Sequence, residues 1–203
     1  MYGLPVSTEV KRALPKAQIY QKFEFKQSQR DAFDRDIARL DFTHVISPQT
    51  LPAIAETAEV KAIFVVRVEL KRSDYDHKNI ILISKLIPHK LVLMLCHEDK
   101  MQIAVYHTGL FISPWSNPEN IHLELAGLNL DSVWQNFISL ISGLKVDEGS
   151  DIDTAIETNR RKEQLTKQLA SLQKQLSNCR QNKKQLELFH EIKKLKRELS
   201  SIK

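Results

Sequence analysis

The chain has 203 residues, of which 42% are hydrophobic and 27% are charged, with a formal net charge of +5. These values are typical of a soluble globular protein with one sizeable core, and they exclude a collagenous or low-complexity chain. No apolar run reaches the roughly 18 residues of a transmembrane helix, and the first residues lack the basic and then apolar order of a signal peptide. We therefore expect a cytoplasmic protein that does not enter a membrane.

The first third of the chain predicts two helices and a short strand. Pro15 indicates the start of a short helix, since proline is accepted in the first turn. A second helix is predicted over residues 28–40, and a short strand over residues 43–47. The second helix rests on apolar residues at helical spacing, which are Phe33, Ile37 and Leu40.

The middle of the chain predicts a strand, a helix and a second strand. Residues 61–71 alternate between apolar and polar side chains, which is the pattern of a half-buried strand. Residues 73–87 show helical spacing, and Pro88 ends the helix. Residues 90–96 are apolar on both faces and predict a central strand. This order favours a parallel β-α-β crossover.

The next segment predicts an antiparallel meander that a helix closes. Short strands are expected at 101–107, 110–115 and 120–125, separated by turn-like connections. Residues 128–142 form an apolar helical face that ends at a glycine, and residues 145–151 are a polar linker.

The rest of the chain, from about residue 153, is strongly helical and carries the excess positive charge. Residues 151–203 contain 13 Lys and Arg against 7 Asp and Glu, whereas residues 1–150 contain 17 against 18. Two heptad patterns meet at a polar break near residue 182, which favours a helical hairpin over one helix of about 50 residues. We define the seam as the apolar heptad positions Leu165, Leu169, Leu172, Leu176, Leu188, Ile192, Leu195 and Leu199.

The predicted fold class is therefore α+β. We expect a mixed sheet, with one β-α-β crossover and an antiparallel meander, flanked by helices and followed by a helical hairpin or coiled-coil tail. The predicted domains are an α+β body over residues 1–148 and a helical tail over residues 149–203.

Several blocks of the sequence resemble an uncharacterised bacterial family, domain of unknown function 4391. The most specific are KLIPHKLVLML at 85–95 and GLNLDSVWQNF at 127–137, and the resemblance spans nearly the whole chain. It implies an α+β body with a charged helical tail and no assigned activity or catalytic residue. Family members tend to accompany helicases and DNA methyltransferases, which implies an accessory role in a restriction-like defence complex.

Glu69 and Lys71 are candidate catalytic residues because of their spacing. An acid-x-lysine at the end of a strand is typical of metal-dependent nucleases, in which two carboxylates hold Mg²⁺. The preceding segment, 43–57, offers no second carboxylate in the right place, and the same spacing describes the solvated face of any half-buried strand. The alternative to a non-enzymatic protein is therefore a metal-dependent nuclease that uses Glu69 and Lys71, or a nuclease-like domain that has lost this activity.

Other classes of site lack their signatures. The chain has no glycine-rich phosphate loop and no nucleophile elbow, and its two cysteines cannot form a zinc site, so no cofactor or metal is expected. The basic tail could neutralise phosphates of nucleic acid without sequence specificity, although interleaved acids fit a solvated helix surface equally well. The candidate nucleic-acid contacts are Arg160, Arg161, Lys162, Lys183, Lys184, Lys193 and Lys194.

Together these observations predict a non-enzymatic interaction protein. Its helical tail would bind a second copy or another protein through the seam, and nucleic acid is a further candidate partner. The alternative is the nuclease-like domain that uses Glu69 and Lys71.

Overall fold

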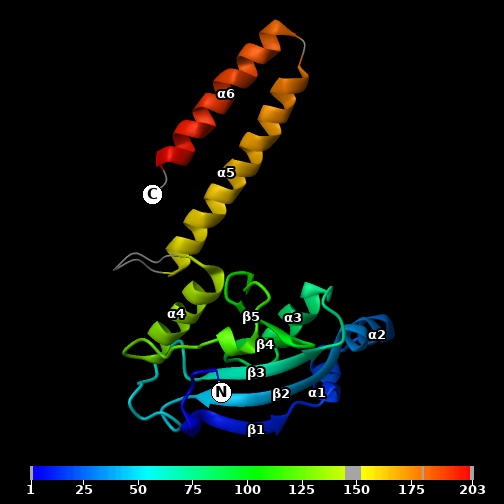
Figure 1. The fold of residues 1–203 in the computed structure, drawn as a ribbon, viewed down its shortest axis with the longest axis vertical. Helices are drawn as coiled ribbons and strands as arrows, with labels where there is room; N and C mark the ends of the chain where they lie inside the picture. Colours follow the sequence, from blue (N-terminus) through cyan, green and yellow to red (C-terminus); the bar gives the residue numbers. More distant parts are fainter. Residues whose placement is uncertain (1, 145–151, 180, 202–203) are drawn as a thin grey trace. The chain divides into compact units, whose positions relative to one another are not determined.

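The computed structural model describes residues 2–144, 152–179 and 181–201. It divides into two compact units, residues 1–143 and 144–203, which we call the body and the hairpin and describe separately (Figure 1). The predicted linker at 145–151 and the predicted domain boundary at 148 lie outside the described residues. No described helix is both long enough and apolar enough to cross a membrane.

The body is built on a six-stranded mixed sheet whose strand order follows the chain, β1 to β6. All neighbouring strands are antiparallel except β3 and β4, which are parallel. The bounds are β1 Glu9–Ala13, β2 Ile37–Ile46, β3 Ile63–Leu70, β4 Lys90–His97, β5 Lys100–Tyr106 and β6 Leu110–Ile112. The predicted α+β class, the crossover and the mixed sheet are thus confirmed.

Two helices precede β2, and the second is shorter than predicted. They are α1, Lys16–Lys22, which starts after Pro15, and α2, Gln27–Asp36. The predicted helix over 28–40 is wrong beyond Asp36, because β2 begins at Ile37 and pairs with both β1 and β3. The predicted strand at 43–47 is only the second half of β2. Ile37 and Leu40 are buried in the same core as Phe33. Because β2 has a bulge between Ile37 and Arg39, two residues three apart in this strand face the core, which is the spacing that a helix would also show.

Three helices cover one face of the sheet. The crossover helix α3, His77–Ser84, is capped by Asp76, whose side chain accepts a hydrogen bond from the Lys78 N–H. Helices α1, α2 and α3 pack on alternate residues of β3 and β4, as the apolar alternation predicts. The core between them includes Ile19, Phe33, Val66, Val68, Ile80, Ile83, Leu93 and Leu95.

The opposite face carries α4, Leu130–Ser142, which contacts β5 and β6. Asn129 caps the start of α4, and Gly143 ends it with a φ of 69°, a left-handed conformation that glycine adopts without strain. The third strand predicted for the meander, at 120–125, is wrong. Residues 120–125 do not pair with any strand of the sheet. Ile121 and Leu123 are nevertheless buried, and the Leu123 N–H donates to the Tyr2 carbonyl.

The second unit is a helical hairpin, which decides between the two predicted forms of the tail. Helix α5, Ile152–Asn178, and helix α6, Asn182–Ser201, pack against each other (Figure 1). Between them, the Gln185 side chain donates to the Cys179 carbonyl, and the Gln185 N–H donates to the Gln181 carbonyl.

Candidate functional site

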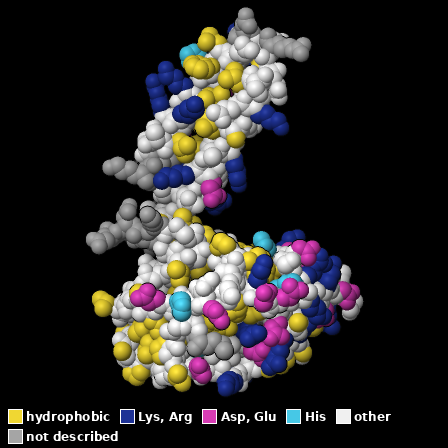
Figure 2. Space-filling model, viewed as in Figure 1, with side chains coloured by type: hydrophobic (Ala, Val, Ile, Leu, Met, Phe, Trp, Pro, Cys, Tyr) yellow, Lys and Arg dark blue, Asp and Glu magenta, His cyan; other side chains and the backbone are white. Residues whose placement is uncertain are grey.

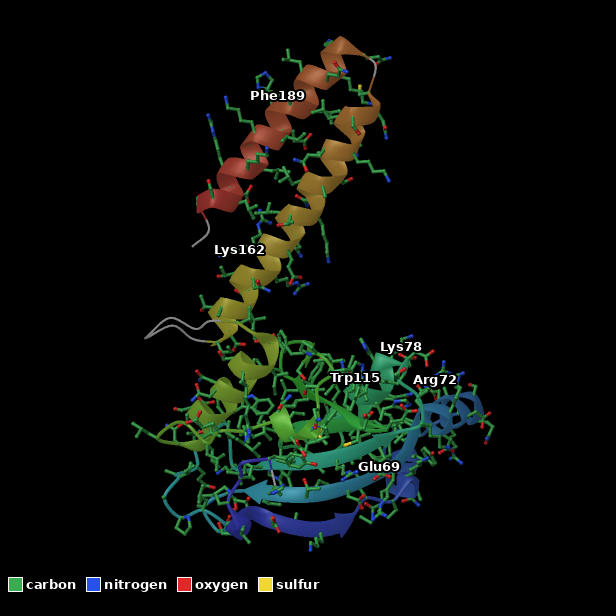
Figure 3. All side chains as sticks on the ribbon, viewed as in Figure 1. Glu69, Arg72, Lys78, Trp115, Lys162 and Phe189 are labelled. Carbon is green, nitrogen blue, oxygen red and sulfur yellow. The ribbon has the colours of Figure 1, made fainter. Side chains whose placement is uncertain are left out.

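Charged side chains gather at the end of the sheet where β3 ends and β2 begins. Because β2 and β3 are antiparallel, the end of one lies beside the start of the other, and Ile37 pairs with Leu70. Figure 2 shows acidic and basic side chains mixed on this end of the body, and Figure 3 labels Glu69, Arg72 and Lys78 there. We call this region the sheet end.

The two residues of the acid-x-lysine spacing have different charge partners. The Glu69 carboxylate lies 3.3 Å from the Arg67 guanidinium, and 43% of its side chain is exposed. Its cross-strand neighbour is Arg39, whose guanidinium lies 2.7 Å from the Asp41 carboxylate. Opposite charges therefore alternate along and across β2 and β3, which is the stabilising arrangement on a solvated sheet face. Lys71 is exposed just beyond β3, and its positive charge interacts with a different acid from Glu69.

That other acid is Asp34, which belongs to a small network on α1 and α2. Its carboxylate accepts hydrogen bonds from the Lys16 ammonium at 2.6 Å and the Tyr20 hydroxyl at 2.7 Å. Burial would raise the pKa of Asp34, but these two hydrogen bonds and the charge of Lys71 outweigh it, so the pKa lies below its usual range. Burial and the hydrogen bond to Asp34 raise the pKa of Tyr20, which stays protonated.

Asp36 is the second carboxylate of the sheet end, and the sequence did not reveal it. It is 1% exposed, and one of its oxygens accepts hydrogen bonds from the Asp76 N–H at 2.8 Å and the Asn79 amide at 2.9 Å. The Arg35 guanidinium lies 3.5 Å from the other oxygen. The Lys71 N–H donates to the Asp36 carbonyl, so a backbone hydrogen bond joins Asp36 to the segment that contains Glu69 and Lys71. The predicted helix over 28–40 concealed it, because Asp36 occupies a polar position there.

The carboxylates of the sheet end do not assemble a metal centre. Across the described residues, no group of three or more His, Cys, Asp and Glu side chains is placed to hold a metal ion. The Asp36 carboxylate is satisfied by α3, and the Glu69 carboxylate by Arg67. The sheet end is therefore an ion-pair network that ties α2, β2, β3 and α3 together.

The seam predicted in the tail lies between the two arms of the hairpin. Leu165 is 2% exposed, and Leu188 and Ile192 are each 6% exposed, while the other five seam residues are half-buried. The Arg161 guanidinium of α5 forms an ion pair with Glu198 of α6 beside the seam. The seam residues thus contact one another within a single chain, and no described seam residue is fully exposed.

The outer face of α6 carries two large apolar side chains that the hairpin leaves uncovered. Leu186 is 60% exposed and Phe189, labelled in Figure 3, is 55% exposed. Neither fits the α6 part of the seam, because Leu186 lies two residues before Leu188 and so faces away from it. The surrounding helical positions are basic and exposed: Lys183, His190, Lys193, Lys196 and Arg197. We call these seven residues the α6 outer face.

The candidate nucleic-acid contacts are spread over both arms. Four lie on α6, namely Lys183, Lys184, Lys193 and Lys194, and all four are exposed. Of the three on α5, Arg161 is engaged by Glu198, and Lys162 is half-buried. The structure therefore places four of the seven predicted contacts on one helix, and Lys184 and Lys193 lie on opposite sides of it.

The chain is an α+β protein with a C-terminal pair of packed helices, and its described residues contain no cluster of three or more His, Cys, Asp and Glu side chains that could hold a metal ion. A family model described as "Domain of unknown function (DUF4391)" matches residues 2–199. The chain belongs to this family, as its sequence blocks indicate. Searches of curated proteins and of solved structures found no match.

Proposed function

We propose that the protein is a non-enzymatic accessory protein that binds another protein through its helical hairpin. The observation that carries this proposal is the α6 outer face, where Leu186 and Phe189 remain exposed although the seam is closed within the chain. Exposed apolar side chains next to one another commonly mark a binding surface, and aromatic residues are enriched at such surfaces.

The charge of this face favours a different protein over a second copy. Leu186 and Phe189 are bordered by lysine, arginine and histidine, and the three acids of α6, Glu187, Glu191 and Glu198, fall on another side of the helix. Two such faces would repel each other, whereas an acidic surface with an apolar pocket would match both features. As the family resemblance implies, the partner would belong to a bacterial DNA-processing or restriction-like assembly.

The substitutions Leu186→Asp and Phe189→Asp, made together, are expected to abolish partner binding and leave the fold intact. Both side chains are exposed, so the cost in stability is below about 0.5 kcal/mol each, while an apolar contact at an interface centre costs at least tenfold in affinity. The measurement is quantitative mass spectrometry of proteins that co-purify with the full chain from its natural host.

Leu128→Asp is the matched control, since Leu128 is 91% exposed and lies in the body. The control should retain the partners that the double variant loses, and light scattering should give the same mass for all three chains. Recovery of the same partners with the double variant would refute docking through α6. A mass that falls from dimer to monomer only in the double variant would show self-association instead.

The second candidate is a nuclease-like domain that has lost its activity. One observation favours it: α2, β2, β3, α3 and β4 follow the helix–strand–strand–helix–strand order of a nuclease core, and antiparallel β2 brings Asp36 to the same sheet end as Glu69 and Lys71. The Asp36 carboxylate is turned into the protein toward α3, and Glu69 is held by Arg67, so neither is presented as a free metal ligand.

We expect no cleavage of duplex or single-stranded DNA by the full chain with Mg²⁺ or Mn²⁺. A metal site needs carboxylate oxygens that are free to coordinate, and the ones at the sheet end bind protein donors. The assay follows nicking and linearisation of plasmid DNA, with Glu69→Ala measured beside the wild type. Cleavage by the wild type that disappears in Glu69→Ala would reverse the order of the two candidates.

A further inference from the structure

The body contains an apolar cleft whose lining shares no residue with the sheet end or the hairpin. It has a volume of about 550 Å³ and lies between β1, α1, β2 and the segment that joins α3 to β4. Volumes of this size are typical of small-molecule sites. Its apolar lining is Val10, Ala13, Leu14, Phe42, Val45, Phe64, Leu86, Ile87 and Pro88.

Two features of the fold lie at this cleft. The pairing of β1 with β2 shifts register between Glu9 and Arg12, and such an irregularity interrupts the regular pairing and bends the edge strand. Phe42 and Phe64 form its aromatic wall, with ring centroids 5.8 Å apart in an edge-to-face arrangement. The His89 ring lies 5.3 Å from Phe64 and extends this wall to the exposed rim.

The rim of the cleft is basic. Arg12, Lys22 and His89 are exposed and line the cleft together with Gln18, and its described lining contains no Asp or Glu. The excess of positive charge is specific to this rim, because residues 1–150 as a whole carry 18 acidic against 17 basic residues. A ligand with an apolar body and one negative group would bury the body against the phenylalanines and pair the group with Arg12 or Lys22.

We propose that the cleft binds a small amphipathic anion, with an apolar chain or ring system and a single carboxylate or phosphate. The neutral or cationic analogue of the same ligand would keep the apolar contacts but lose the rim contacts. The site stands apart from the proposed docking of the hairpin, because all of its lining residues belong to the body.

The test compares decanoate, decanol and decyltrimethylammonium in isothermal titration calorimetry with the full chain. These probes share one apolar chain and differ in charge. Decanoate is expected to bind about tenfold more tightly than decanol, and the cation more weakly than either. Methyl spectra from nuclear magnetic resonance should place decanoate near Val10, Val45 and Ile87. Equal binding of all three probes, or shifts confined to other methyl groups, would overturn the proposal.

Four variants separate the rim from the walls. Arg12→Gln and Lys22→Gln should each weaken decanoate several-fold and leave decanol unchanged, whereas Ala13→Trp should fill the cleft and weaken both probes. Lys11→Gln is the matched control, since Lys11 lies on β1 but does not line the cleft. Thermal unfolding of each variant checks that the body is folded. Loss of decanoate binding in Lys11→Gln to the same extent as in Arg12→Gln would refute the assigned rim.

Discussion

Replacing Asp36 by alanine is expected to lower the free energy of unfolding of the body by about 3 kcal/mol. The carboxylate is 1% exposed and accepts from the Asp76 N–H and the Asn79 amide, so its removal leaves the buried Asn79 amide and the part-buried Asp76 N–H without this partner. Each unsatisfied buried donor costs about 1–3 kcal/mol, and a cavity adds to this. Urea unfolding followed by tryptophan fluorescence measures the effect, since Trp115 and Trp134 both lie in the body.

Asp36→Asn separates the hydrogen bonds from the charge. One asparagine oxygen can accept from both donors, so this variant should lose only the weak ion pair with Arg35, about 1 kcal/mol. Asp31→Ala is the control for an exposed acid on the same helix, and it should change stability by less than about 0.5 kcal/mol. If Asp36→Asn is as unstable as Asp36→Ala, charge and not hydrogen bonding makes Asp36 important. If neither variant is destabilised, the network at the sheet end does not hold α2 to α3.

Replacing Leu188 by aspartate is expected to unfold the hairpin and leave the body folded. Leu188 is 6% exposed between α5 and α6, and placing a charge there costs about 3 kcal/mol or more. A pair of helices has little stability to lose, because isolated helices are marginal in water. Since α5 and α6 contain more than half of the described α-helical residues, the far-ultraviolet circular dichroism signal should fall by about half.

The matched control for this substitution is Leu186→Asp, two residues earlier on the same helix. Leu186 is 60% exposed, so the same chemical change should leave the circular dichroism signal unaltered. The fluorescence of Trp115 and Trp134 should stay native in both variants, because both residues belong to the body. A native circular dichroism signal in Leu188→Asp would mean that the seam does not hold the two arms together.

Much of the fold follows from local sequence patterns. The alternation at 61–71, the doubly apolar strand at 90–96 and the helix ended by Gly143 predict β3, β4 and α4 because each pattern has one period and clear boundaries. The heptad positions also predict which residues lie in the seam. They cannot say whether the seam closes within one chain or between two, since both arrangements bury the same side chains.

The elements that were missed have physical reasons. Around Ile37 the chain passes from helix to strand without proline or glycine, and a bulge in β2 places Ile37 and Leu40 in the core at a spacing that a helix would also give. Asp36 could not be recognised as buried, because its partners, Asp76 and Asn79, lie about 40 residues away in sequence. The cleft beside β1 likewise joins residues from β1, α1, β2, β3 and the segment after α3, which are far apart in sequence.

The strand order of the sheet has a consequence for how the protein is made. Each strand from β2 onward pairs with the strand just before it in the chain, so the sheet can grow by one strand at a time as the chain emerges. The last helix of the body ends at Ser142, before α5 begins at Ile152, so a translating ribosome completes the body first. The nascent body can therefore bury its sheet while the basic hairpin is still being synthesised.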